Sequence, residues 1–133
     1  MLAHSITPPP VKPRNVRHMT RADLPAVLAI EAETWGAWDE ARFLSELRPY
    51  EWEDTSATSI GVVYESDGGE VLGFAVYRSG EEDVWVQNLA AVNEWVRGSL
   101  CGYVSWAACP VVPALAGFEL PRRTIHWGRV QAA

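Results

Sequence analysis

The stretch from Val84 to Arg97 reads VWVQNLAAVNEWVR, and it decides the fold. Its first part is an apolar run, which predicts a strand over Val84–Val92. A polar segment that ends in Arg97 then breaks the strand pattern. The small residues of Gly98–Gly102 come next and predict a loop that opens a helix. A strand, a small-residue loop and a helix in this order can present several backbone N–H groups to an anion.

The residues before this strand carry clear start and stop signals. Thr20 is a typical helix cap, and Pro25 is tolerated in the first helical turn. Asp39 can cap a second helix, and Ser66–Gly69 is a strong hairpin turn. The expected elements are an edge strand at 15–19, helices at 20–33 and 39–47, and strands at 60–65 and 70–77.

This order of elements predicts an α+β fold, in which helices pack on a mostly antiparallel sheet. The chain has 133 residues, enough for one domain, which we expect to span residues 14–133. Residues 1–13 contain four prolines and are expected to form a disordered tail.

Composition excludes several classes of partner. The formal net charge of −6 argues against binding to nucleic acid or to an anionic membrane. Cys101 and Cys109 do not have the spacing of a metal site, and two cysteines do not make a disulfide framework. The sequence shows no signal peptide and no membrane-spanning run, so a cytoplasmic location is expected.

Several segments, in their order and spacing, resemble one known protein family. Val16–Glu31 is similar to the opening of a GNAT domain, and Trp38–Leu47 continues the similarity through the second helix. Gly73–Tyr77 and Asn88–Ala90 are similar to the central hairpin and the coenzyme-binding strand. The resemblance covers roughly residues 16–97. The opening segment is particularly similar to the bacterial ribosomal-protein N-terminal alanine acetyltransferases. The resemblance implies a GNAT-like mixed sheet.

The resemblance also implies where acetyl-CoA binds. The coenzyme's pantetheine arm pairs with the backbone of one strand, which requires an open strand edge at Leu89–Ala91. Its pyrophosphate is held by the loop that follows. The cofactor-binding residues implied are Leu89, Ala90, Ala91, Arg97, Gly98, Ser99 and Gly102. Trp35 and Trp38 lie where the family contacts its acceptor, although both can equally be packing residues.

After Arg97 the sequence changes in character. Residues 1–97 hold 16 of the 17 acidic residues, and Pro110 and Pro113 interrupt the apolar pattern. A helix at 100–108 and a strand at 124–127 are expected. Only 21 residues separate Trp95 from Gly117, which resembles the end of a GNAT domain. One helix and a turn use most of that length, so the sequence leaves open whether residues 98–133 form the family's fifth strand. The C-terminal part is thus expected to be truncated or atypical, through a deletion or a shifted reading frame.

The resemblance implies an acetyl-CoA-dependent N-acetyltransferase that works by direct attack of an amine on the thioester. No residue matches the family's catalytic carboxylate or tyrosine, so the catalytic residues stay unknown. Roughly a tenth to a sixth of an α-amine is neutral at pH 7, against about one part in 2,500 of a lysine amine. A protein without a general base therefore favours a protein N-terminus, ribosomal or other, as acceptor.

Two other readings stay open. A catalytically degenerate GNAT-like module, acting as a protein-interaction domain, fits the incomplete loop. A small α+β domain without a cofactor is the third.

Overall fold

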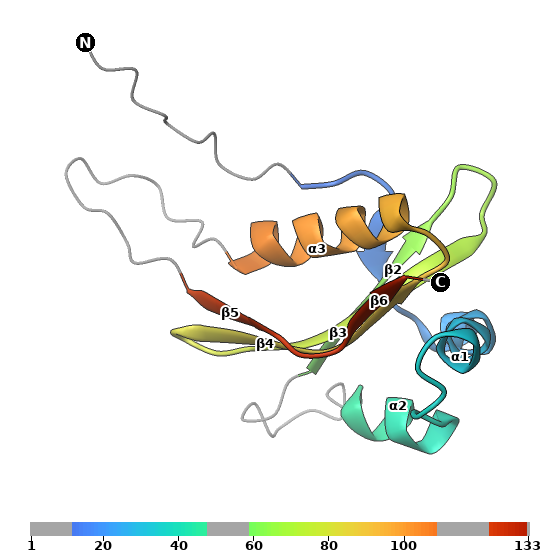
Figure 1. Ribbon diagram of the computed structural model, residues 1–133, viewed down its shortest axis with the longest axis horizontal. Coiled ribbons are helices and arrows are strands. Elements are labelled where there is room, and N and C mark those ends of the chain that lie inside the picture. The colour runs from blue at the N-terminus through green and yellow to red at the C-terminus, as the bar shows by residue number, and fades with distance from the viewer. Residues whose placement is uncertain (1–11, 48–58, 109–122, 133) are drawn as a thin grey trace, which may run out of the picture.

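The computed structural model describes residues 12–47, 59–108 and 123–132. Within them, a six-stranded sheet has helix α3 on one face and helices α1 and α2 on the other (Figure 1). The strands are β1 (Val16–His18), β2 (Ser59–Glu65), β3 (Val71–Ser79), β4 (Asp83–Ala91), β5 (Thr124–Trp127) and β6 (Val130–Ala132). The helices are α1 (Leu24–Glu33), α2 (Glu40–Glu46) and α3 (Glu94–Ala108), with a 3-10 turn, η1 (Arg21–Asp23), before α1. The predicted α+β class is confirmed.

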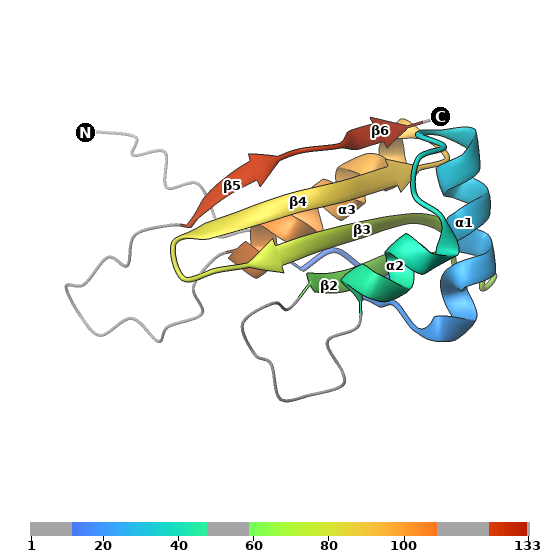
Figure 2. The same cartoon turned by 90° about the horizontal axis from the view of Figure 1, so that it is seen from below.

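The sheet has the order β1-β2-β3-β4-β5, and β6 also pairs with β4. Strands β1 to β4 pair antiparallel, whereas β5 and β6 run parallel to β4. A parallel neighbour needs a crossover between the strands, and α3 lies within that crossover. Figure 2 shows β5 beside the first half of β4 and β6 beside its second half. This is the mixed, mostly antiparallel sheet that the GNAT resemblance implied.

The helices and strands predicted before residue 93 are confirmed. The ends of each of these strands agree with the prediction to within two residues. The prediction of β5 at 124–127 is also confirmed. A fifth strand does pair beside Val84–Val92, and it is built from residues after Gly117 rather than from the segment between Trp95 and Gly117. Residues 1–11 of the expected tail and the Gly117 segment lie outside the described residues.

The starts of η1 and α2 follow the sequence signals closely. The Asp39 side chain accepts a hydrogen bond from the Arg42 N–H at 2.8 Å and so caps α2. At η1, the Asp23 carboxylate accepts from the Thr20 N–H at 2.7 Å. The Arg17 guanidinium also donates two 2.8 Å bonds to Asp23, and this keeps the pKa of that carboxyl below its usual range. Arg17 in β1 thereby ties the edge strand to the start of α1.

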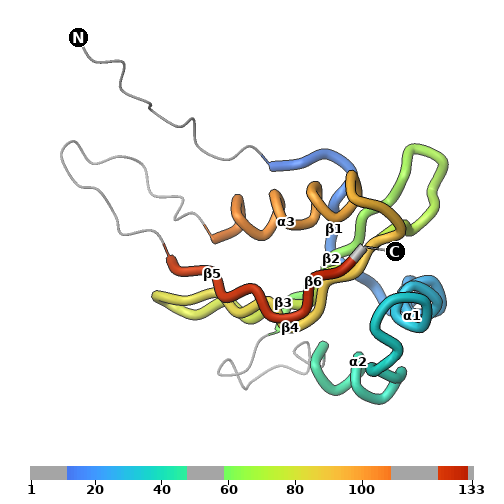
Figure 3. Tube along the Cα trace, viewed as in Figure 1, coloured from blue at the N-terminus to red at the C-terminus, as the bar shows by residue number. Residues whose placement is uncertain are grey.

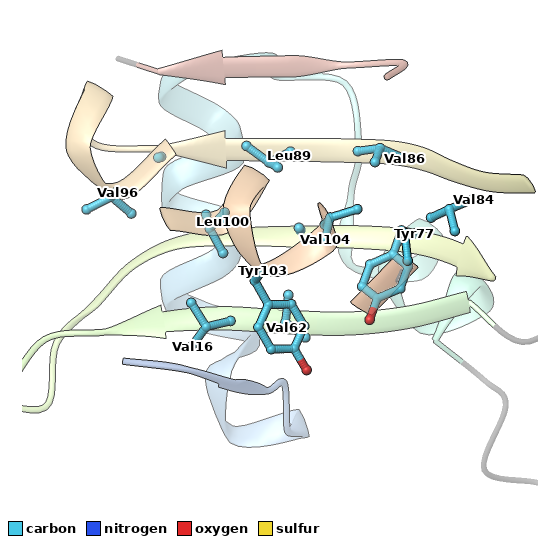
Figure 4. Packing of buried hydrophobic residues seen from close by; sticks show 13 residues of the cluster. Val16, Val62, Tyr77, Val84, Val86, Leu89, Val96, Leu100, Tyr103 and Val104 are labelled. Atoms are coloured by element: carbon cyan, nitrogen blue, oxygen red, sulfur yellow. The ribbon is translucent and has the colours of Figure 1, made fainter. Parts of the chain in front are cut away.

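Helix α3 packs on one face of the sheet through a stripe of apolar side chains (Figure 4). Val96, Leu100 and Val104 recur at helical spacing and are buried. The helix comes very close to β3 at Gly73. A Cβ added there would lie 2.7 Å from Val96 Cγ1 and 2.8 Å from Leu100 Cδ1. Glycine is therefore required at this position by the packing of α3.

The opposite face is covered by α1 and α2. Phe43 of α2 meets Phe74 of β3 edge-on, with ring centroids 5.4 Å apart, and both are fully buried. Leu24, Val27 and Ile30 of α1 complete this second core. The two cores lie on opposite faces of the same strands, so the middle of β3 and the second half of β4 are buried on both sides.

Gly73→Ala is expected to lower the free energy of unfolding by about 1–3 kcal/mol, because the methyl group overpacks the contact with α3. Urea unfolding followed by circular dichroism measures the change. Gly98→Ala is the matched control, since Gly98 is exposed on α3 and an added Cβ meets nothing within 4 Å. It is expected to stabilise the protein by about 0.5–1 kcal/mol, through helix propensity. Equal effects from both substitutions would contradict the close approach at Gly73.

Candidate functional site

Strand β4 is kinked at its middle by a bulge. The register with β3 passes from Val76–Asn88 to Tyr77–Val86, which leaves Gln87 as an extra residue. A bulge bends its strand and changes the direction of the residues that follow. Leu89, Ala90 and Ala91, the strand residues expected to bind the coenzyme, come directly after this bend.

The outer edge of β4 is paired along both halves. Before the bulge, β5 pairs with Asp83–Val86, and after it β6 pairs with Leu89–Ala91. The Leu89 N–H donates to the Arg129 carbonyl at 2.7 Å. Figure 3 shows the trace bending between β5 and β6 as it follows β4. The open edge that the resemblance requires at Leu89–Ala91 is therefore not found, because β6 fills it.

The link between β5 and β6 fits tightly against the bulge. The Gly128 N–H donates to the Val86 carbonyl at 3.0 Å, and a Cβ added to Gly128 would overlap that carbonyl oxygen. Only glycine lets the backbone come this close. Strand β6 has no strand signal in the sequence, because its three residues are too few for a pattern.

Side-chain contacts of His126 and Arg123 hold β5 in place. His126 Nε2 lies 2.8 Å from Asp83 Oδ1, and the His126 ring stacks on Trp85 with centroids 3.8 Å apart. Arg123, just before β5, donates to the carbonyls of Ala107 and Ala108 at 2.6 and 3.0 Å. These carbonyls belong to the last turn of α3, so Arg123 joins the helix end to the sheet.

The predicted phosphate loop is helical instead. Helix α3 begins at Glu94, six residues before the predicted start, because the Asn93 side chain caps it by accepting from the Val96 N–H at 2.9 Å. The Arg97 N–H donates to the Asn93 carbonyl at 3.1 Å, which removes it as a donor for a ligand. The prediction of a loop after Arg97 is wrong, since burial of Val96 and Leu100 requires helix from Glu94 onward.

The four residues predicted for that loop are spread along α3. Gly98 is exposed, whereas Arg97, Ser99 and Gly102 are half-buried. The Arg97 guanidinium forms an ion pair with Glu94, one turn earlier. Burial raises the pKa of the neighbouring Cys101 thiol, although Arg97 acts in the opposite direction. A thiol of raised pKa is a poor nucleophile at neutral pH.

The two predicted acceptor-site tryptophans have different environments. Trp35 is half-buried at the end of α1, and its Nε1–H donates to the Leu89 carbonyl at 3.4 Å. The Arg129 guanidinium lies 4.6 Å from the centre of the Trp35 ring. Trp38 is only 8% exposed and packs edge-on against Phe43. Trp35 therefore lies beside Leu89 of β4, whereas Trp38 is a packing residue of the second core.

A buried polar pair beside Leu89 was missed by the sequence reading. Glu31 of α1 is 1% exposed and Asn88 of β4 is fully buried. Asn88 Nδ2 donates to Glu31 Oε1 at 2.6 Å. The signal was present in the sequence, because position 31 continues the buried stripe of Leu24 and Val27 at helical spacing. A charged residue on an apolar helix face calls for a buried partner.

Other site types are absent from the part of the chain that the structure describes. There, no group of three or more His, Cys, Asp or Glu side chains is placed to hold a metal ion. Among the described helices, none combines the length and apolar character needed to cross a bilayer.

Comparison with protein-family profiles finds no match, and comparison with curated protein sequences finds none either. Among solved structures, the chain is similar to a conserved protein of unknown function from Enterococcus faecalis V583, described as a probable N-acyltransferase. The two are 14% identical with a TM-score of 0.39, over 71% of this chain and 24% of that one. This chain thus spans about a quarter of the protein it matches. A likeness this distant decides nothing about activity.

Asn93→Ala is expected to lower the free energy of unfolding by about 1 kcal/mol, because the Val96 N–H loses its cap. Asn93→Asp, which keeps a capping oxygen, is the matched control and should retain the stability of the parent protein. Thermal and urea unfolding measure both. An unchanged stability in Asn93→Ala would contradict a helix that starts at Glu94 and would favour the predicted loop.

Proposed function

We propose that this chain is a GNAT-type N-acyltransferase domain that takes an acyl group from acyl-CoA, with acetyl-CoA as the expected donor. The observation that carries the proposal is the arrangement at β4. A bulged strand has a parallel neighbour reached through α3, in the element order that the sequence resemblance implied. The parts of the sequence that carry the resemblance, from Val16 to Ala91, lie largely in this sheet and its two N-terminal helices.

The acceptor proposed is an amine, with the α-amine of a protein N-terminus, such as that of a ribosomal protein, as the favoured class. Trp35 supports this assignment, because its indole reaches the Leu89 carbonyl next to the proposed coenzyme strand. The coenzyme supplies the activated acyl group. The chain's part is to hold the coenzyme arm on the Leu89–Ala91 edge and to admit the amine beside Trp35. An α-amine needs less help from a base than a lysine does.

Because β6 is paired with β4, the coenzyme can bind there only when β6 moves away. The Leu89 N–H that would pair with the coenzyme arm already donates to Arg129. The coenzyme arm does not fit this edge while β6 is paired with it, so β6 and the coenzyme compete. When only a fraction of molecules has the edge open, the apparent dissociation constant rises by the inverse of that fraction.

A chain that ends after Gly128 is expected to bind acetyl-CoA more tightly than the full chain, on the order of tenfold, because a few strand hydrogen bonds no longer compete. Tryptophan fluorescence during titration measures the binding, since Trp85 and Trp95 are exposed near the ends of β4. ADP, which lacks the pantetheine arm, is the control ligand and should not distinguish the two chains. Gly128→Ala in the full chain should act in the same direction as the truncation.

Transfer is tested on a peptide with a free α-amine, by mass spectrometry, against the same peptide blocked at its N-terminus and carrying one lysine. Acetylation of the first and not the second is expected. If neither the full chain, the truncated chain nor Gly128→Ala binds acetyl-CoA at millimolar concentration while all remain folded, the transferase proposal is overturned.

A second candidate is the non-catalytic GNAT-like module that binds a protein partner. Two observations favour it: β6 fills the coenzyme edge, and α3 uses the amide of Arg97 for its own helix. The absence of acetyl-CoA binding in every variant above is the result that would select it.

A further inference from the structure

The buried pair of Glu31 and Asn88 poses a problem of hydrogen bonding. One hydrogen bond joins them, from Asn88 Nδ2 to Glu31 Oε1 at 2.6 Å. The other oxygen of each group, Glu31 Oε2 and Asn88 Oδ1, is buried without a partner. If Glu31 is ionised, both of these atoms are acceptors, and neither can satisfy the other. A buried carboxylate with one unpaired oxygen, beside an unpaired carbonyl, is costly.

A single proton on Glu31 removes this problem. A carboxylic acid has one acceptor oxygen and one O–H donor, and a carboxamide has one acceptor oxygen and one N–H₂ donor. Oε1, which accepts from Asn88, then serves as the carbonyl oxygen, and Oε2 carries the proton. The two atoms left without partners are the donor and the acceptor that such a pair would join.

We propose that Glu31 keeps its proton in the folded protein at neutral pH and forms a ring of two hydrogen bonds with the Asn88 carboxamide, Oε2–H to Oδ1 and Nδ2–H to Oε1. Asn88 lies next to the bulge residue Gln87, and Glu31 lies near the end of α1. The pair therefore fixes α1 to β4 at the bend of the strand. Glu31 and Asn88 are positioning residues, and this assignment is independent of the proposed function.

The surroundings of the pair agree with a neutral Glu31. Burial is the largest influence and raises the pKa of the carboxyl, against smaller opposite effects of Asn88, Arg129 and the Trp38 N–H. Arg129 is the charged group that reaches Glu31 from the β5–β6 link. Its guanidinium lies on the Trp35 ring, and among the described residues no ion pair to Glu31 is formed. Arg129 thus does not replace the missing partner of Oε2.

The pair also bears on the position of Leu89. Asn88 precedes Leu89 in β4, and the Leu89 carbonyl accepts from Trp35, four residues after Glu31. Two successive residues of β4 are thus tied to the same end of α1. Loss of the pair is expected to loosen Trp35 as well as the helix.

The direct test is ¹³C NMR of the Glu31 side-chain carboxyl in the full chain, assigned by its absence in Glu31→Gln. A chemical shift of the protonated form that stays constant from pH 4 to pH 7 is expected. Titration with a midpoint near the ordinary value of 4.5 would overturn the proposal. This measurement needs no variant beyond the one used for assignment.

Unfolding as a function of pH gives a second, independent test. The unfolded chain ionises Glu31 near pH 4.5, its ordinary pKa, and burial raises the pKa of this carboxyl in the folded chain. Under the proposal, the folded chain keeps Glu31 neutral above that pH. The contribution of Glu31 is therefore fully present below that pH and is lost as pH rises toward the folded pKa. The unfolding equilibrium constant of the parent, divided by that of Glu31→Gln, is expected to rise about tenfold per pH unit above pH 5. A ratio that stays flat from pH 5 to pH 8 would overturn the proposal.

Substitutions separate a proton-dependent pair from simple packing. Gln has the size of Glu and replaces the O–H donor by an N–H donor, so Glu31→Gln should fold and keep the tryptophan fluorescence spectrum of the parent, to which Trp35 contributes. Glu31→Ala should destabilise the protein at every pH and shift that spectrum. The double variant Glu31→Gln with Asn88→Asp exchanges the acid and the amide between the two positions, so the pair can still form. It should be more stable than the double variant Glu31→Ala with Asn88→Asp, and should recover most of the stability that this second variant loses. Equal stability of the Gln and Ala variants would contradict the ring.

Discussion

Strand β4 makes backbone hydrogen bonds along both of its edges, and most of the structure depends on this pairing. One edge meets β3 antiparallel, and the other meets β5 and β6 parallel. The bulge at Gln87 divides the strand, and each half has its own outer neighbour. Because the second half of β4 is buried on both faces by α3 and α1, its backbone groups must find partners within the protein.

The same requirement explains why β6 is docked where a coenzyme arm was expected. An edge at Leu89–Ala91, open in the predicted site, carries unpaired donors and acceptors next to two hydrophobic cores. The chain's own segment after Gly128 satisfies them. A ligand that uses the edge must offer at least the same hydrogen bonds. The two proposed functions therefore share one fold and differ in the ligand that takes the place of β6. In the acyltransferase it is the coenzyme arm, and in the interaction module it is a protein partner.

Much of the fold was predictable because the signals were local. Asp39 caps α2, and the Ser66–Gly69 turn fixes the β2–β3 hairpin, and both depend on residues a few positions apart. The start of α3 was missed because Gly98 and Ser99 look like a loop, whereas the packing of Val96 and Leu100 against Gly73 decides the helix. Tertiary contacts of this kind outweigh local propensity. Strand β6 forms by pairing with β4, which is more than 30 residues away in the sequence. Its three residues are too few to show a strand pattern.

The candidate site was only partly predictable. The resemblance led to Leu89–Ala91 and Trp35, which the structure brings together, and to Arg97–Gly102, which it places along α3. The pairing of Glu31 with Asn88 joins residues 57 positions apart, and sequence alone gives no distance between them. Only the charge at position 31 of an apolar stripe indicated that a partner was needed.

Hydrogen exchange at the Leu89 amide, followed by NMR in the full chain, tests the closed edge of β4 most directly. Ala90 is the internal reference, because it pairs with Phe74 of β3 whatever β6 does. Since the Leu89 N–H donates to Arg129, its exchange is expected to be strongly protected, though less than that of Ala90. Exchange at the rate of an unprotected amide, with Ala90 still protected, would show an open edge and contradict this account.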